Sequence, residues 1–302
     1  MFNMLIKEIC NELNIEYTYL SKEWLIKLTK NNKTVYLANN KFPLNNHVVG
    51  LIMDDKYATY EVLKDLDIPV AKHHIFYSEN NHEKYTQGCN SNEDLQNIFD
   101  EYNRNVVVKP NNGYQGIDVY HITNYSDLTN TTNKLFKNNY SISICPYYHI
   151  KNEYRVVVLD NDIKLLYKKN NPTIVGDGIH SIKELLIEFN PYYFSKLSLP
   201  EDILPKGEEY TYDFRFNLSK GSTASIDIDA KIKDALIKIS KSITTKTNIR
   251  FATIDIINTT DDELLVLEIN SGVTIDKAIK FLPDGYNIAK SIYKEAIIKL
   301  ME

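Results

Sequence analysis

The segment "VVVKPNNGYQGIDVYHI", residues Val106–Ile122, predicts a strand, a short loop and a second strand. The chain has only ten glycines in 302 residues, so the pair Gly113 and Gly116 within one loop is informative. Glycine lets backbone N–H groups approach an anion closely, and Lys109 at the end of the first strand supplies a positive charge. The segment therefore indicates a phosphate site. Taken alone, it also fits an ordinary hairpin with a glycine turn, and it matches neither G-x-G-x-x-G nor G-x-x-x-x-G-K-[ST].

Length and composition limit the partners of this chain. A length of 302 residues exceeds the size of most single cores, which predicts two or three lobes. The net charge of −5 gives no broad positive field for nucleic acid or an anionic membrane. The start, "MFNMLIKEICNELN", is too short and too interrupted for a signal peptide or a membrane span. Three widely spaced cysteines favour a reducing compartment, so we expect a cytoplasmic protein with small-molecule ligands.

Hydrophobic periodicity and capping signals predict an α+β (mixed α/β) fold, in which strands and helices alternate unevenly. A hairpin is expected around the polar turn Asn31–Asn32, and Ser91 with Asp94 forms a capping-box pattern. The expected helices are 4–13, one from Asp54 or Asp55 to just before Pro69, 91–102, 126–137, one within "GDGIHSIKELLIEF", 230–245 and 286–301. Further strands are expected near 141–146, 153–160, 163–169, 250–258 and 263–269. Residues 190–222 are expected to be irregular, and a loop of this length is usually functional or mobile.

A second group of polar residues lies in "FATIDIINTTDDELLVLEINSG". Alternation along the second strand places Glu268 and Asn270 on one face and apolar Leu267 and Ile269 on the other. An antiparallel partner strand can bring Asp255 opposite the acidic face. Two carboxylates and an amide oxygen suit Mg²⁺, and burying carboxylates without a cation is costly. The alternative is a solvated hairpin face.

A third group lies in "NEYRVVVLDNDIKLLYKK", where Glu153 and Arg155 share one face of a strand and Lys168 and Lys169 end the next. An acid can accept hydrogen bonds from ribose hydroxyls, and an arginine can stabilise phosphoryl charge. A surface cross-strand ion pair is the plainer explanation. The histidines form no nucleophile–base or zinc pattern, which leaves Ser/His/Asp chemistry without support.

The order of these groups is more specific than any one of them. A lysine after a helix start is followed by Lys-Pro with a glycine loop, an "EYR" strand, "VGDGIHSIKEL", "NLSKG", and finally Asp…Glu-x-Asn. This order resembles the ATP-grasp ligases, and most closely the ATP-grasp portions of cyanophycin synthetase and of the bifunctional glutathione synthetases. "GLIMDDKYATYEVLKDLDIPV" is similar to their helix before the nucleotide lobe. "TIVGDGIHSIKELL" and "FNLSKGSTASIDI" resemble two segments of that subgroup, and the similarity covers residues 20–302.

The resemblance implies ATP as the nucleotide, together with Mg²⁺ or, in its place, Mn²⁺. The residues implied to contact ATP are Lys56 and Lys109 at the phosphates, the covering loop Asn112, Gly113, Tyr114, Gln115 and Gly116, the backbone of Tyr147, Tyr148 and His149 at adenine, and Glu153 at the ribose. The implied metal ligands are Asp255, Glu268 and Asn270. The residues implied to face the transferred phosphoryl group are Arg155, Lys169 and Arg215. The loop 217–221 would close over the substrates.

The activity implied is that of an ATP-dependent ligase, which activates a small carboxylate as an acyl phosphate and joins it to an amine, such as an amino acid or peptide. The expected division is a substrate segment 1–50, an N-lobe 51–145 with the glycine loop, and a C-lobe 146–302 with the metal site. Glutathione synthetase and a specialised natural-product ligase are alternatives within this class. A non-catalytic ATP-binding protein and a phosphotransferase are alternatives outside it, and a homo-oligomer is one option for the assembly.

The sequence departs from the family pattern in three places. Pro146 stands where an acid beside adenine is usual, which puts side-chain recognition of the base in doubt. After Asn270 the chain continues with Ser271-Gly272-Val273 rather than the frequent proline–glycine ending, so the acceptor end can differ. The basic pair before "VGDG" is Lys168–Lys169, which lacks the bidentate geometry of arginine.

Overall fold

The computed structural model describes residues 1–78, 91–195 and 198–302. Cys89, one of the three cysteines considered above, lies outside the described residues. Cys10 and Cys145 are buried free thiols. None of the helices in these ranges combines the length and the apolar character that crossing a bilayer requires.

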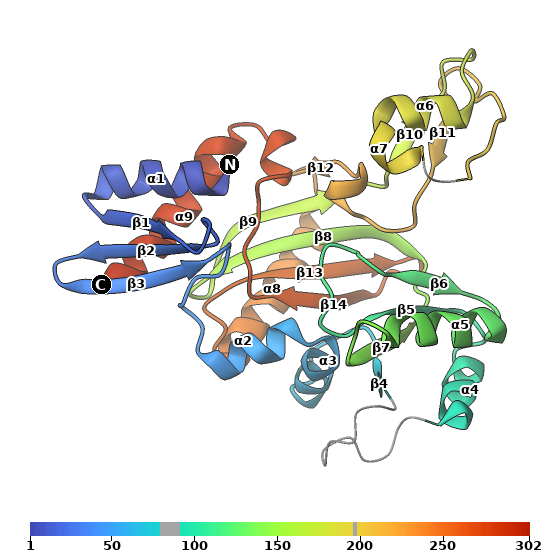
Figure 1. The fold of residues 1–302 in the computed structure, drawn as a ribbon, viewed down its shortest axis with the longest axis horizontal. Coiled ribbons are helices and arrows are strands. Elements are labelled where there is room, and N and C mark those ends of the chain that lie inside the picture. Colours follow the sequence, from blue (N-terminus) through green and yellow to red (C-terminus); the bar gives the residue numbers. More distant parts are fainter. Residues whose placement is uncertain (79–90, 196–197) are drawn as a thin grey trace.

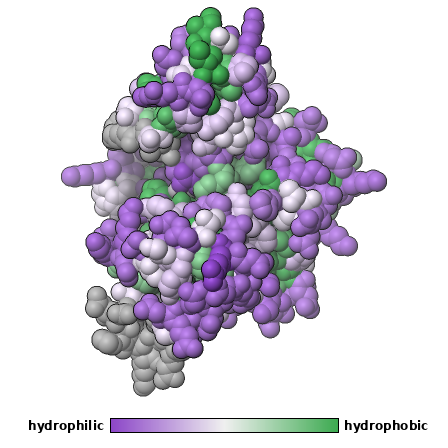
Figure 2. Space-filling view, turned by 90° about the vertical axis from the view of Figure 1, so that its right-hand side faces the viewer, coloured by the Kyte–Doolittle hydropathy of each residue, from purple (hydrophilic) through white to green (hydrophobic). Residues whose placement is uncertain are grey.

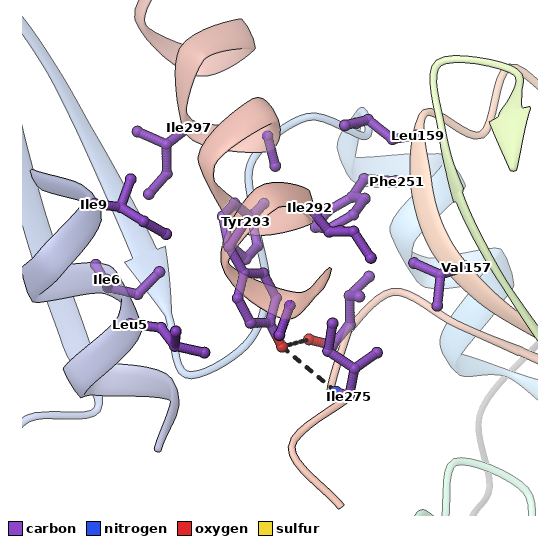
Figure 3. Close-up of a cluster of buried hydrophobic side chains, with 14 of the residues drawn as sticks. Leu5, Ile6, Ile9, Val157, Leu159, Phe251, Ile275, Ile292, Tyr293 and Ile297 are labelled. Carbon is purple, nitrogen blue, oxygen red and sulfur yellow. Dashed lines mark hydrogen bonds between the residues drawn. The ribbon is translucent and has the colours of Figure 1, made fainter. Parts of the chain in front are cut away.

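The first unit contains elements from both ends of the chain (Figure 1). It is built from helix α1 (Phe2–Leu13), the antiparallel strands β1 (Glu16–Leu20), β2 (Leu25–Lys30) and β3 (Lys33–Ala38), and the last helix α9 (Gly285–Met301). Leu5, Ile6 and Ile9 of α1 and Tyr293 and Ile297 of α9 share one buried cluster, drawn in Figure 3. The same cluster includes residues of the central sheet, so the first unit and that sheet have one continuous core.

The central sheet is antiparallel and has the strand order β12-β9-β8-β13-β14. Its strands are β8 (Ile150–Leu159), β9 (Asp162–Lys169), β12 (Ala224–Ser225), β13 (Phe251–Thr259) and β14 (Leu264–Asn270). Helix α8 (Ala230–Thr247) packs on β8 and β9. Helices α2 (His47–Asp54) and α3 (Lys56–Asp65) pack against β14.

A second sheet has the order β4-β7-β5-β6. Its strands are β4 (His74–Tyr77), β5 (Val106–Pro110), β6 (Tyr120–Ile122) and β7 (Ser141–Pro146), and it carries helices α4 (Asn92–Glu101) and α5 (Tyr125–Phe136). Strands β5 and β6 pair antiparallel, as Val106–Ile122 predicts. The predicted capping box of Ser91 and Asp94 is confirmed at the start of α4.

A small subdomain contains most of the segment that was expected to be irregular. It consists of β10 (Thr173–Val175), α6 (Ile182–Phe189), α7 (Pro191–Phe194) and β11 (Glu209–Thr211), and two short 3-10 helices, Leu218–Lys220 and Ala278–Lys280, lie outside it. Ile174 and Leu186 share a core of their own with Phe194 and Leu204, so part of the segment predicted to be irregular packs on the subdomain. Figure 2 shows hydrophobic residues exposed at the top of the molecule, where this subdomain lies.

Candidate active site

Four side chains lie in one row across the central sheet. Arg155 on β8 lies opposite Tyr167 on β9 and opposite Asp255 on β13. Asp255 in turn lies opposite Glu268 on β14, which confirms the predicted antiparallel approach of the two carboxylates. The Asn270 side-chain amide donates to Glu268 over 3.4 Å, so the three predicted metal ligands are close together. Directly opposed residues of neighbouring strands share a face of the sheet.

A β-bulge interrupts the alternation on β14. Asp255 pairs with Glu268, but the next residue, Ile256, pairs with Val266, which leaves Leu267 as the extra residue. Val266 and Ile269 are therefore the buried core residues of this strand, three positions apart, while Leu267 is only half-buried. Ile269 lies in the core as an apolar residue of the face opposite Glu268, whereas Leu267 stands at the bulge, where strict alternation is interrupted.

Two cations bind Asp255, which is 1% exposed. Arg155 donates to its two carboxylate oxygens over 2.7 and 2.5 Å, and Lys169 lies 3.2 Å away. Burial raises the pKa of Asp255, but the charges of Arg155 and Lys169 outweigh that effect and hold it below its usual range. Lys169 also donates to the buried carboxylate of Glu153, whose pKa burial raises. Glu153 and Lys169 thus form a buried ion pair, which rules out the surface cross-strand pair that the sequence left as the alternative.

Two buried lysines lie at the junction of the sheets. The Lys56 ammonium donates to the carbonyl oxygens of Asn111 over 3.3 Å and Gly113 over 2.5 Å, and lies 3.9 Å from the Glu268 carboxylate. Burial lowers its pKa. Lys109 is 7% exposed, and its ammonium makes no hydrogen bond or ion pair within the described ranges of the chain. The two ammonium groups therefore have less counter-charge than buried cations normally have.

The glycine loop contacts the segment after β11. The Gly116 carbonyl accepts from Arg215 over 3.1 Å and from Lys220 over 3.3 Å, and the Asn217 amide donates to the Gln115 carbonyl over 2.6 Å. Gly116 has φ +63°, and a Cβ there would lie 2.9 Å from the Asn217 amide nitrogen. The loop thus requires glycine both for its backbone angle and for this close approach. Tyr114, at its tip, is exposed.

The segment between β7 and β8 presents backbone groups and aromatic rings. The Tyr147 N–H donates to the Asn105 carbonyl, and the His149 carbonyl accepts from Thr260, each over 2.9 Å. The Tyr147 carbonyl and the His149 N–H make no hydrogen bond to the described part of the chain. The Tyr148 hydroxyl accepts from the Lys72 N–H over 3.0 Å, and burial raises its pKa to about 12. The Tyr147 ring stacks on His121 at 3.9 Å between centroids.

Some residues of the site were predicted only as members of a loop and had no role of their own. Asn111 begins the loop predicted to cover the phosphates; it is buried, donates to Asp55 over 2.6 Å and accepts from the Tyr57 N–H over 3.1 Å. It therefore connects the glycine loop to the start of α3. Lys220 lies within the predicted loop 217–221. His73 is fully buried, with Nδ1 2.7 Å from Ser143 Oγ, and burial near Lys109 holds its pKa well below the usual value.

The donor set fits a hard divalent cation. No three His, Cys, Asp or Glu side chains among the described residues gather into a metal-binding cluster. The predicted set differs from such a cluster because it combines only two carboxylates, Asp255 and Glu268, with the amide of Asn270. Oxygen donors of this kind suit Mg²⁺, which keeps coordination positions for phosphate and water.

Comparisons with known proteins agree with this geometry. Residues 207–296 match the model of the RimK-like ATP-grasp domain. The chain is 27% identical over 177 residues to the glutathione biosynthesis bifunctional protein GshAB of Enterococcus faecalis, an alignment that covers 56% of this chain and 21% of that protein. The chain therefore spans about a fifth of the length of this curated relative.

Solved structures share the fold at low sequence identity. A bifunctional glutathione synthetase from Pasteurella multocida matches with a TM-score of 0.54 and 19% identity, over 96% of this chain and 43% of that one. A D-alanine–D-alanine ligase from Bacillus anthracis matches with a TM-score of 0.56 and 15% identity, over 85% and 68% of the two chains. The chain has the ATP-grasp fold, and the mixed α/β prediction is confirmed.

Proposed function

We propose that this ATP-grasp chain is an ATP-dependent carboxylate–amine ligase. It would activate a small carboxylate as an acyl phosphate and join it to an amine, with release of ADP and phosphate. The observation that carries the proposal is the pair of buried ammonium groups, Lys56 and Lys109, beside a glycine loop, with the Glu268 carboxylate 3.9 Å from Lys56. Asp255 pairs with Glu268 across the sheet and adds a second carboxylate. Buried cations without full counter-charge favour an anionic ligand, and the opposing carboxylates favour its metal counter-ion.

The remaining parts of a nucleotide are matched by groups nearby. The Tyr147 carbonyl and the His149 N–H supply one acceptor and one donor, which complement the amino group and ring nitrogen of adenine. This backbone pair supports base recognition even though Pro146 supplies no acid. Glu153 would accept from the ribose hydroxyls, and the charge of Lys169 offsets part of the rise in the pKa of Glu153 that burial causes.

Asp255, Glu268 and Asn270 would hold Mg²⁺ or Mn²⁺. When bound, such an ion would neutralise phosphate oxygens and act as a Lewis acid. Arg155 and Lys169, which already contact Asp255, are placed to bring positive charge to the same region. Their own contribution would be electrostatic and would need no covalent chemistry of the protein.

The reaction would run in two steps. A carboxylate oxygen of the substrate attacks the γ-phosphorus in line, the bond to the ADP oxygen breaks, and an acyl phosphate forms. The amine then attacks the acyl carbon, loses a proton, and the tetrahedral intermediate collapses to the amide and phosphate. Positioning and cationic stabilisation by Arg155, Lys169 and Arg215 would supply most of the rate enhancement.

Contacts between the glycine loop and the segment after β11 support protection of the acyl phosphate from water. Gly116 and Gln115 accept hydrogen bonds from Arg215, Lys220 and Asn217 across the site. A closed loop of this kind excludes water from a reactive intermediate.

The test is phosphate release from ATP and Mg²⁺ with pooled carboxylic acids, with and without pooled amines. The precursor dipeptide of glutathione with glycine is included as a separate pair, because the relatives carry the glutathione name. Release that requires both pools, with a product lighter by one water than its two substrates, is the expected result. If acids alone support turnover of ATP and yield a stable phosphorylated product, the protein is a phosphotransferase and not a ligase. ATP binding without turnover across the panel would favour the non-catalytic alternative.

A further inference from the structure

A cavity of about 450 Å³ lies between α2, α3, the end of α8 and β14. Its walls are mainly apolar and include Met53 of α2, Val62 and Leu66 of α3, and Ile269 of β14. A cavity of this volume and composition is within the range that small-molecule ligands occupy in proteins. None of the residues assigned above to ATP or to the metal ion lines it.

The cavity lies directly behind the candidate metal site. Ile269 stands between Glu268 and Asn270 on β14, and its side chain belongs to the core on the opposite face of the strand. Helix α2 ends at Asp54, and α3 begins at Lys56. The walls of the cavity are thus the elements that position a phosphate lysine and two metal ligands. Any ligand that moves α2 and α3 relative to β14 changes the distance between these groups.

Charges at the rim of the cavity define the ligand that fits. Glu61 and Asp65 lie one turn apart on α3, both exposed, and neither makes an ion pair to the part of the chain that the structure describes. Lys246, on the opposite rim, donates to the Leu66 carbonyl over 2.7 Å. The α3 side of the rim therefore offers two carboxylates beside an apolar interior, while the Lys246 ammonium on the other side is bonded to a carbonyl oxygen. The α3 side is complementary to an ammonium group on an apolar body.

We propose that this cavity binds a small amphiphile with an apolar chain and a protonated amine, and that its occupancy changes the affinity for nucleotide. The apolar chain enters between Met53, Val62 and Ile269, and the ammonium lies between Glu61 and Asp65. Because coupling between two sites is reciprocal, ATP changes the affinity for the amphiphile by the same factor. The binding site itself does not depend on the ligase reaction.

The test is calorimetric titration of the full chain with n-octylammonium, and with octanoate and octanol as matched probes. We expect octylammonium to bind at least tenfold more tightly than octanoate, a difference of about 1.4 kcal/mol. The double variant Glu61→Gln/Asp65→Asn removes this preference, whereas Asp234→Asn on the exposed face of α8 keeps it. Val62→Trp fills the cavity and abolishes binding, and Val49→Phe is a second filling variant in case the first one unfolds.

The proposed binding site would be refuted if the three probes bind equally, or if octylammonium still binds to a correctly folded variant whose cavity is filled. ATP titrations with and without octylammonium test the coupling, and we expect the apparent ATP affinity to change at least threefold. An unchanged ATP affinity at saturating octylammonium would overturn the coupling. If ATP does not bind at all, the proposed function is contradicted. The titrations with the three probes would still show whether the cavity binds an amphiphilic amine.

Discussion

Lys109 is held in the protein interior without a counter-charge among the described residues. We predict that Lys109→Met abolishes phosphate release and at the same time raises the free energy of unfolding by about 1 kcal/mol, because an unpaired buried polar group is costly. Chemical denaturation and the phosphate assay measure the two effects. Lys33→Met, at an exposed lysine, is the control and is expected to change neither. Loss of both activity and stability in Lys109→Met would mean that Lys109 has a structural partner.

The ion pair of Arg155 and Asp255 places a fully buried carboxylate against a largely buried guanidinium. We predict that Arg155→Met lowers the free energy of unfolding by about 3 kcal/mol, because Asp255 keeps a buried charge that Lys169 neutralises only in part. Adding Asp255→Asn recovers part of this loss in a double-mutant cycle. Arg104→Met breaks an exposed ion pair with Asp100 and is expected to cost less than about 0.5 kcal/mol. Equal effects of the two arginine substitutions would contradict the burial argument.

The same pair predicts a pH dependence. The folded pKa of Asp255 lies below its ordinary value of 3.8, so the unfolded state binds the proton first as the pH falls. The stabilisation from Arg155 is therefore complete above about pH 4 and is lost as the pH falls through the lower folded value. The coupling energy of the double-mutant cycle should shrink between pH 6 and pH 3. A coupling energy that does not change over this range would exclude Asp255 as the titrating group.

At the scale of elements, the glycine loop depends on one backbone conformation. We predict that Gly116→Ala raises the KM for ATP about tenfold and lowers stability by about 1 kcal/mol, because φ is +63° and the new Cβ would meet the Asn217 amide. Gly50→Ala is the matched control, since Gly50 lies in helix α2 with open space around its Cβ position. That control should be neutral or slightly stabilising. A normal KM in Gly116→Ala would show that the loop does not close over the nucleotide.

Most elements could be predicted because their signals are local. The capping box of Ser91 and Asp94 and the turn Asn31–Asn32 lie within a few residues of the structure they define. Strand β1 and helix α2 were missed, since β1 is short and α2 is apolar on most sides. The bulge at Leu267 could not be predicted, because it arises from pairing with β13 and leaves no mark within the strand.

At the scale of the whole molecule, the two ends of the chain meet in one core. We predict that Ile6→Ala lowers the free energy of unfolding by about 2–5 kcal/mol and that scanning calorimetry still shows a single transition, because the cluster continues into the central sheet. Met4→Ala on the same helix is the control, since Met4 is 61% exposed. A separate early transition that leaves ATP binding intact would show that the first unit unfolds independently.

The division into 1–50, 51–145 and 146–302 stays a prediction. The packing shows that α9, which belongs to the predicted C-lobe 146–302, completes the core around α1 in the predicted segment 1–50. The Tyr293 hydroxyl of α9 also donates to the Val273 carbonyl over 3.1 Å, three residues beyond the end of β14. This contact connects the first unit to the candidate acceptor end of the site.

The sequence by itself determined the kinds of groups in the site and their order along the chain. Lys109 with its glycine loop, Glu153 with Arg155, and Asp255 with Glu268 and Asn270 were all identified from spacing and resemblance. Only the tertiary structure decided that Arg155 and Lys169 converge on Asp255, that Lys109 has no partner in the described chain, and that α9 closes the first core. The physical reason is that burial and long-range pairing depend on the register and packing of strands far apart in sequence, which local patterns do not encode.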